Sequence, residues 1–538
     1  MRRVVADVVS GTRRARRDGV LSTPEVDDGR GLAFSSAQGR WVLAATVTGS
    51  GIAFLDSTVV NVALPQIGED LNTDVAGLQW VLNGYLVALS ALILLGGSLG
   101  DLFGRKRMFQ LGVVVFAGAS MACAVAPNVA TLVGARVLQG VGGALLTPGS
   151  LAILEASFRT DDRSRAIGAW SGLSGVASAF GPFIGGWLVD AASWRWIFLI
   201  NLPLAVAVLA ITARHVPESL DPDADRHVDG LGAVLIGVSL GALSWGLIAA
   251  GDEGWGAASV WLPLAAGVAG LVLFVLVELR SSHPMLPLGI FRSAQFRAAN
   301  LVTAAVYAAL GGVFFLLILQ LQQVLGYSAL AAGAATLPIT LLMLALSARS
   351  GALAARIGPR FQMTVGPLVV ALGVLLMIRI DAGSPYVATV LLPVILVGLG
   401  LATTVAPLTS TALGAVEDRH AGVASGVNTT VARAAQLSAV AVLPVAAGLT
   451  GNAYLEPDTF TDGFRVAMII TAALSAVGGL VAWAMVRNPE RVPALEPGMV
   501  APAPAPNYFC GAEGTPIDTC PGSSAGTSAG HGTGDRAA

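Results

Sequence analysis

Long apolar stretches alternate with short polar segments along most of the chain. A helix needs about 20 apolar residues to cross the hydrocarbon core of a bilayer, and runs of that kind recur fourteen times. A single apolar segment can satisfy its backbone hydrogen bonds in lipid only as a helix. We therefore predict an all-α polytopic membrane protein with fourteen transmembrane spans, at residues 41–64, 79–100, 108–126, 130–154, 164–189, 195–213, 230–250, 259–278, 297–323, 330–349, 362–380, 386–414, 421–448 and 464–486.

The composition supports a surface that faces lipid. Of the 538 residues, 54% are hydrophobic and only 12% are charged, whereas a soluble domain carries about 25% charged residues. The many Ala and Gly residues, with Lys106 as the single lysine, favour a bacterial source with a GC-rich genome. A soluble protein is therefore excluded.

The basic residues predict an orientation. If the N-terminus lies in the cytosol, nearly all arginines fall in cytosolic segments, and only Arg195, Arg379 and Arg465 fall in the opposite loops. Acidic residues such as Glu69 and Glu253 gather in those opposite loops instead. This division follows the positive-inside rule. We therefore predict a multi-pass protein of the plasma (inner) membrane with both termini in the cytosol.

Several classes of chemistry are excluded by residue type. Lys106 stands between two arginines, so there is no Gly-Lys-Ser/Thr phosphate loop, and ATP does not drive the protein directly. Residues 96–100 (GGSLG) match the pattern of a nucleophile elbow, but that motif needs a histidine base, and all five histidines lie in loops or in the tail. The three cysteines lack metal-ligand spacing. We expect no catalytic residue, no metal, no cofactor and no nucleic-acid partner.

An internal repeat divides the chain into two halves. Residues 97–106 (GSLGDLFGRK) and 351–360 (GALAARIGPR) match at an offset of 254, and the same offset relates Gly168 to Gly422 and Ser171 to Ser425. Repeated halves with a binding site between them are a common plan of transporters. The predicted parts are a cytosolic N-terminal segment 1–40, a six-helix bundle 41–214, a linker with two inserted spans 215–280, a second six-helix bundle 281–487 and a disordered cytosolic tail 488–538.

The loop after the second span resembles the signature of the major facilitator superfamily. Its glycines permit a tight turn, and its aspartate lies near a cluster of basic side chains. The resemblance implies a conformational clamp that holds the two halves together on the cytosolic side in the outward-open state. The residues that match the signature are Gly97, Asp101, Gly104, Arg105 and Arg107.

Three further segments resemble motifs of the fourteen-helix drug:proton antiporters. Residues 55–65 (LDSTVVNVALP) are similar to the first-helix motif, and residues 136–143 (RVLQGVGG) to the fourth-helix motif. Residues 175–186 (GVASAFGPFIGG) are similar to the antiporter motif of the fifth helix. In the family this helix face seals the halves and limits proton leak. The residues of this chain that carry it are Gly181, Pro182, Gly185 and Gly186.

The resemblance implies a fold and an activity. The fold is the major facilitator fold, with two six-helix bundles and two inserted helices. The activity is proton-coupled efflux of small organic molecules such as drugs, antibiotics or secondary metabolites, with a small-molecule substrate, protons and the lipid bilayer as partners and a monomer as the working unit. The alternative on the same fold is a proton-coupled importer of a small organic solute. A sensor that does not transport would need a soluble output domain.

Asp56 is the only carboxylate that lies well inside a predicted span. An ionisable group in the membrane is costly and is therefore a functional candidate that needs a partner. Asp56 lies about 13 Å from the outer end of its helix and Arg136 about 9 Å from the outer end of the fourth, so the two could pair. We predict Asp56 as the proton carrier and Arg136 as the group that modulates its protonation. The other interpretation is an ion pair that only fixes helix packing.

Arg433 is a third charge within the spans, and no acidic residue lies in the predicted spans of its half. Two arginines and one aspartate make a cavity less suited to dicationic drugs than to neutral, zwitterionic or anionic compounds. The predicted cavity residues are Asn61, Trp80, Asn83, Tyr85, Gln139, Trp170, Trp245, Tyr307, Gln320, Asn428 and Arg433. The other interpretations are an interfacial anchor for Trp80 and helix packing for the other aromatic and amide residues. For Arg433 the candidate partners are backbone carbonyls, Asn428 and an anionic part of the substrate.

Overall fold

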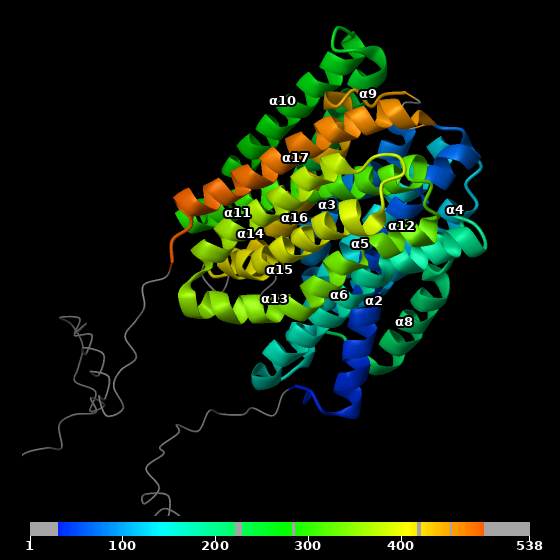
Figure 1. Ribbon diagram of the computed structural model, residues 1–538. Helices are drawn as coiled ribbons and strands as arrows, with labels where there is room; N and C mark the ends of the chain where they lie inside the picture. The colour runs from blue at the N-terminus through cyan, green and yellow to red at the C-terminus, as the bar shows by residue number, and fades with distance from the viewer. Residues whose placement is uncertain are drawn as a thin grey trace, which may run out of the picture. The chain divides into compact units, whose positions relative to one another are not determined.

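A computed structural model describes residues 31–220, 229–281, 284, 286–416, 421–451 and 455–488. The described residues form helices joined by short connections (Figure 1). Residues 1–30 of the predicted N-terminal segment and residues 489–538 of the predicted tail lie outside the described residues.

The first half and the inserted pair are built from nine helices among the described residues. They are α2 (Ala37–Leu71), α3 (Val75–Phe103), α4 (Arg105–Ala124), α5 (Val129–Ser157), α6 (Thr160–Ala191), α7 (Trp196–Leu199), α8 (Asn201–His215), α9 (Gly230–Glu253) and α10 (Ala258–Arg280).

The second half contains α-helices with short 3-10 or π turns at some ends. Its elements are η1 (Leu288–Arg292), α11 (Ala294–Leu319), η2 (Gln320–Val324), α12 (Ala329–Ala335), α13 (Leu337–Ile357), α14 (Pro359–Leu376), η3 (Met377–Arg379), η4 (Val387–Leu391), α15 (Leu392–Leu413), α16 (Ala421–Ala446) and α17 (Pro457–Met485).

The predicted spans agree with these helices. Among the described residues, thirteen helical segments are long and apolar enough to cross a membrane. They coincide with thirteen of the predicted spans, and the remaining span, 164–189, falls within the 32 residues of α6. The prediction of an all-α polytopic membrane protein is confirmed.

Two predicted spans are less regular than expected, and proline explains both. The span 330–349 is divided at Thr336 between α12 and α13, where Pro338 has no N–H to continue the helical ladder. The span 386–414 begins with the π-turn η4, and Pro393 follows within the first turn of α15. Both segments are still long and apolar enough to cross a membrane.

The internal repeat relates equivalent helix ends. Gly104 follows α3 with a φ of 106°, and Gly358, at the same offset of 254, follows α13 with a φ of 89°. Only glycine adopts this backbone conformation without strain. The two matching loop segments of the sequence therefore form the same turn in each half.

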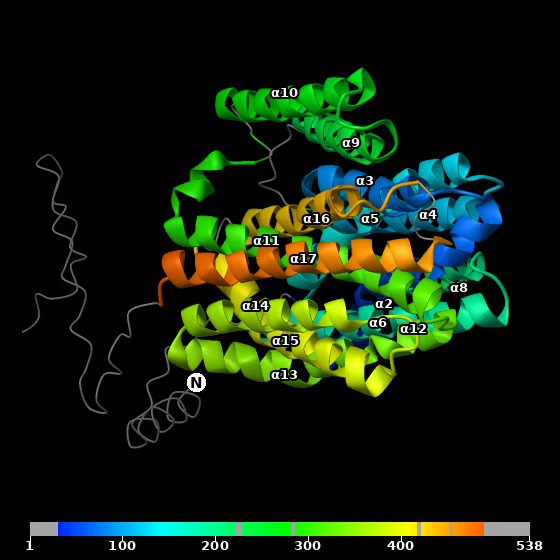
Figure 2. The ribbon, with the colours of Figure 1, turned by 45° about the horizontal axis from the view of Figure 1, so that its top comes forward.

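The helices of each half pack mainly against one another. In the first half α2 contacts α5, α6 and α8, and in the second half α11 contacts α15, α16 and α17. The halves meet mainly where α3 crosses α16 and where α6 crosses α12 and α13, and α2 also contacts α11 and α12. The inserted helices α9 and α10 pack together at the edge of the bundle, where α9 contacts α3 and α16 (Figure 2).

We call the end of the bundle that carries the α2–α3 connection the outer end, since the arginine distribution predicts it to be extracellular. The C-terminus of α6 and the N-terminus of α12 lie at this end too, because spans alternate in direction.

Candidate functional site

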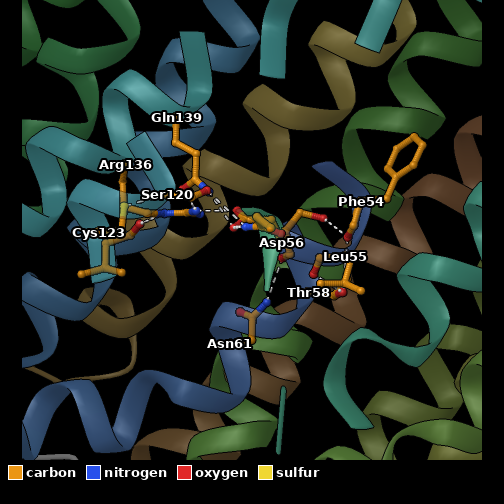
Figure 3. Close-up of polar contacts among 12 residues, drawn as sticks. Phe54, Leu55, Asp56, Thr58, Asn61, Ser120, Cys123, Arg136 and Gln139 are labelled. Atoms are coloured by element: carbon orange, nitrogen blue, oxygen red, sulfur yellow. Dashed lines mark hydrogen bonds and ion pairs between the residues drawn. The ribbon is translucent and has the colours of Figure 1, made fainter. Parts of the chain in front are cut away.

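Asp56 of α2 and Arg136 of α5 form a buried ion pair (Figure 3). The Nη1 group of Arg136 donates to Asp56 Oδ2 at 2.5 Å, and the two side chains are 1% and 0% exposed. In such surroundings a carboxylate is unfavourable unless hydrogen bonds and an opposite charge compensate it. The site therefore depends on the contacts around this pair.

Amide and hydroxyl groups complete the surroundings of Asp56. Its Oδ1 atom accepts from Gln139 Nε2 at 2.8 Å and from Asn201 Nδ2 at 3.2 Å. Both amides also donate to Ser120 Oγ, at 2.9 and 3.2 Å, and Gln139 Oε1 accepts from Arg136 at 2.7 Å. Four helices, α2, α4, α5 and α8, thus contribute to one buried network.

The guanidinium of Arg136 is also held by groups outside the carboxylate network. Its Nε donates to the carbonyl of Val81 at 3.1 Å, and its Cζ lies 4.5 Å from the ring centroid of Tyr85 and 5.9 Å from that of Phe198. Cation–π contacts of this kind stabilise a desolvated guanidinium. Arg136 would therefore keep its hydrogen bond to Val81 and its contacts with the two aromatic rings if Asp56 lost its charge.

A cavity adjoins the pair and lies between the two halves. About 430 Å³ of space there is not filled by protein atoms, and this figure includes space that is open to solvent. Helices α2, α3 and α5 of the first half and α11 and α16 of the second supply the walls. The lining residues are Ser57, Asn61, Leu82, Tyr85, Leu86, Arg136, Gly311, Phe314, Arg433, Gln436 and Val440.

The structure separates the predicted cavity residues into two groups. Asn61, Tyr85 and Arg433 line the cavity, together with Arg136. Gln139 belongs to the buried network behind it. The others are not among the lining residues of this cavity.

Those other residues have contacts elsewhere. Trp80 packs on Trp245 of α9 with ring centroids 5.7 Å apart, because the inserted pair covers α3. Trp170 donates to Ser50 Oγ at 3.0 Å, and Asn428 donates to Thr303 Oγ1 at 2.8 Å.

Three more of them are packed into the protein. Tyr307 packs against the hydrophobic core, Asn83 is fully buried, and Gln320 donates to the carbonyl of Ile380 at 3.2 Å.

Helix α6 uses its glycines to approach two helices closely. A Cβ atom at Gly181 or Gly185 would collide with Thr58 or with Val59 of α2. A Cβ at Gly186 would lie 2.4 Å from the carbonyl oxygen of Ala329, in α12 of the other half. The antiporter-type residues therefore face one helix of their own half and one of the opposite half.

Gly333 is the counterpart on α12. A Cβ atom at Gly333 would lie 2.1 Å from the carbonyl oxygen of Pro182. The backbones of α6 and α12 are thus in contact through glycines on both sides. The sequence signal for Gly333 is only a glycine in an apolar span, which is too common to single out.

Further hydrogen bonds join the halves at the outer end. The carboxylate of Asp190, in the last turn of α6, accepts from the backbone N–H groups of Ala329 at 3.1 Å and Leu330 at 2.8 Å. These groups lie in the first turn of α12, where an anion is favourable. Gln322 Nε2 donates to the carbonyl of Val62 at 2.8 Å. These contacts join the two halves at the outer end.

The second crossing at the outer end is built on different chemistry. Gln79 of α3 donates to the carbonyl of Val440 in α16 at 2.6 Å. Residue 444 is proline, which has no N–H to bond that carbonyl within the helix. The internal repeat relates the two crossings, because Gln79 is equivalent to Gly333 and Gly186 is equivalent to Val440 at the offset of 254. One crossing is thus built on glycines, and the related one has a glutamine side chain that bonds a backbone carbonyl.

We expect Gln79→Leu to weaken the closed outer end by about 1–3 kcal/mol, because the Val440 carbonyl loses its donor while it stays buried. The distance between spin labels on the outer ends of α3 and α16 should shift toward longer values. In a Pro444→Ala background the helix supplies its own N–H, so the same substitution should have a smaller effect. Equal effects in both backgrounds would contradict this role of Gln79.

The loop signature forms contacts within its own half. Arg105 Nη2 lies 2.8 Å from Asp101 Oδ1, and Arg105 Nη1 donates to the carbonyl of Ala152 at 3.4 Å. Arg107 Nε lies 3.6 Å from the carboxylate of Glu218, which follows α8. The signature residues therefore contact α5 and the segment that follows α8, both in the first half. The clamp between the halves stays a prediction.

The second half repeats this arrangement with other residues. Glu218 Oε1 accepts from the backbone N–H of Lys106 at 3.0 Å, and Asn488 Oδ1 accepts from that of Arg360 at 3.1 Å. Lys106 and Arg360 are related by the offset of 254. Glu218, which follows α8, thus caps the N-terminus of α4, and Asn488, which follows α17, caps the N-terminus of α14.

Ser120, Phe198 and Asn201 are site residues that the sequence alone does not identify. Asn201 and Ser120 are fully buried polar side chains within spans, and a polar residue in a span is the signal that could identify them. Serine and asparagine also occur in spans for helix packing, so the sequence does not indicate that Ser120 and Asn201 belong to the network around Asp56.

Comparisons with known proteins agree with this geometry. A family model described as Major Facilitator Superfamily matches residues 46–440. The multidrug resistance protein Stp of Mycobacterium tuberculosis is 36% identical over 77% of this chain and 77% of its own length. The tetracenomycin C resistance and export protein of Streptomyces glaucescens is 36% identical over 79% of this chain and 80% of its own.

A solved structure shows the same arrangement of helices. The crystal structure of a peptide transporter POT in complex with sulfate has a TM-score of 0.61, at 15% identity, over 85% of this chain and 96% of that one. At this identity the likeness extends to the fold alone.

Proposed function

The chain belongs to the major facilitator superfamily, in its drug:proton antiporter branch, and on that premise we propose that Asp56 carries the protons that drive its export of small organic molecules such as antibiotics. Relatives named for multidrug resistance and for tetracenomycin C resistance and export support this activity. The chain is a multi-pass membrane protein with a small-molecule substrate.

One observation carries the proposal, the position of Asp56 beside the cavity between the halves. Asp56 is fully buried and bound to Arg136, and Arg136 also lines the cavity. A proton on Asp56 would remove the charge that holds Arg136 in place. The guanidinium would then redistribute toward Val81, Tyr85 and the cavity. Protonation and occupancy of the cavity would thereby affect one another, as coupled transport requires.

We propose that the contacts between the halves at the outer end change during transport. Export requires that the contacts of Asp190 with α12 and of Gln79 with α16 break when the cavity opens outward and re-form when it closes. The glycine contacts between α6 and α12 would reseal this end against protons. The loop signature around Asp101 would close the cytosolic end in the opposite state.

The orientation and the assembly follow from the same premise. We expect both termini in the cytosol of a bacterial plasma membrane, because that orientation puts nearly all arginines on the cytosolic side. We expect a monomer to transport, since both halves and the cavity belong to one chain. The family is a transporter family and generally not enzymatic.

Drug uptake into everted membrane vesicles tests the proposed function. Export becomes uptake in this orientation, so vesicles that contain the protein should accumulate tetracenomycin C when an inside-acid pH gradient is imposed. An uncoupler should abolish the accumulation, and vesicles without the protein should show none. Uptake that survives the uncoupler would contradict proton coupling. Uptake that requires the inverse gradient would favour the importer.

A further inference from the structure

Arg433 of α16 lies at the cavity without a carboxylate partner. It is partly buried, and its Nη1 group donates to Gln436 Oε1 of the same helix at 3.1 Å. No carboxylate among the described residues lies within salt-bridge distance of its guanidinium. The cavity lining includes no acidic residue either. Arg433 therefore differs from Arg136, whose charge is matched by Asp56.

An unmatched arginine at this depth needs a counter-charge. A cation in the membrane interior is unfavourable unless an anion or water compensates it. Asp56 already binds Arg136 and two amides, so it is not available to Arg433 without breaking that network. An anionic ligand in the cavity would supply this counter-charge.

The remaining walls suit an amphipathic molecule with an aromatic body. Leu86, Phe314 and Val440 supply apolar surface, and Ser57, Asn61 and Tyr85 supply polar groups around it. A planar guanidinium binds carboxylate or sulfonate oxygens with two parallel hydrogen bonds. Polar and apolar groups so arranged can orient a ligand with one acidic end.

We propose that the cavity binds organic anions, with Arg433 pairing with the acidic group of an aromatic substrate. The inference rests on the proposed export function and names the substrate class of the same cavity. Neutral molecules of the same shape bind more weakly, because they leave the guanidinium without a counter-charge.

Binding of two matched fluorescent probes to the purified full-length protein tests this inference. Dansylate carries a permanent sulfonate, and dansylamide has the same ring system without the charge. Their emission reports entry into an apolar cavity. The wild-type protein should bind dansylate more tightly than dansylamide. Arg433→Gln should weaken dansylate binding roughly 10- to 100-fold and leave dansylamide nearly unchanged.

Two variants separate charge recognition from a structural role. Arg433→Lys keeps the charge and should weaken dansylate binding less than Arg433→Gln, since it loses only the paired geometry. Arg349→Gln removes an exposed arginine of α13 and should have no effect. Equal losses for both probes in Arg433→Gln, or wild-type binding of dansylate no tighter than that of dansylamide, would overturn the inference. Gradient-driven uptake of tetracenomycin C into everted vesicles that contain the same protein keeps the proposed function standing in that case, and a lack of uptake there counts against that function as well.

Discussion

Asparagine in place of Asp56 should reduce drug uptake driven by a pH gradient to the level of vesicles without the protein. Asparagine keeps the size of the side chain, but its single carbonyl oxygen can accept either from Arg136 or from Gln139 and Asn201. It cannot bind and release a proton, so the gradient has no group through which to act. Everted membrane vesicles with an imposed inside-acid gradient measure this loss directly.

Two controls distinguish lost coupling from lost folding. Glu69→Gln makes the same chemical change at an exposed position of the same helix and should leave uptake unchanged. Asp56→Asn alone leaves Arg136 without its counter-charge, which costs roughly 3–5 kcal/mol for a buried pair. The double variant Asp56→Asn, Arg136→Gln restores neutrality and should fold better than the single variant while remaining uncoupled. Gradient-driven uptake by either Asp56 variant would refute the assignment.

The ion pair itself can be anticipated from the sequence. Only one acid lies well within the spans, and helix lengths put Asp56 and Arg136 at similar depth. The structure brings them into contact. The bonds of the two amides to Asp56 cannot be anticipated, because Gln139 and Asn201 reach Asp56 only through the packing of α2, α5 and α8. Depth follows from helical rise, whereas the direction of a side chain depends on its neighbours.

The inserted helices explain why Trp80 does not line the cavity. The residue type of Trp80 is compatible with a place in the cavity lining or with an interfacial anchor. Trp80 faces Trp245 of α9 instead, and nothing in the sequence indicates which side of α3 the inserted pair covers. The spans themselves can be predicted in full, since a long apolar run is sufficient evidence for a membrane helix.

Alanine in place of Gly186 should open the outer end to protons and impair transport. Its Cβ atom would lie 2.4 Å from the backbone carbonyl of Ala329, so α6 and α12 must separate. Overpacking of this kind costs about 1–3 kcal/mol, which would change the ratio of closed to open molecules by roughly 5- to 150-fold. A pH-sensitive dye trapped in proteoliposomes should report a faster proton leak, and gradient-driven uptake should fall accordingly.

The same substitution elsewhere on α6 provides the control. A Cβ atom added at Gly168 would have no neighbouring atom within 4 Å, so Gly168→Ala should leave both the leak and the uptake unchanged. Gly333→Ala, on the opposite side of the crossing, should reproduce the leak of Gly186→Ala. A tight bilayer with Gly186→Ala would show that this contact does not seal the outer end.

Counter-movement of protons and drug tests the central claim most directly. Proteoliposomes with a trapped pH dye and an outward or inward drug gradient, without any imposed pH gradient, report whether drug flow drives protons the opposite way. The wild-type protein should produce a pH change whose sign reverses with the drug gradient, and Asp56→Asn should produce none. A pH change in the Asp56→Asn proteoliposomes equal to that of the wild type would contradict the account.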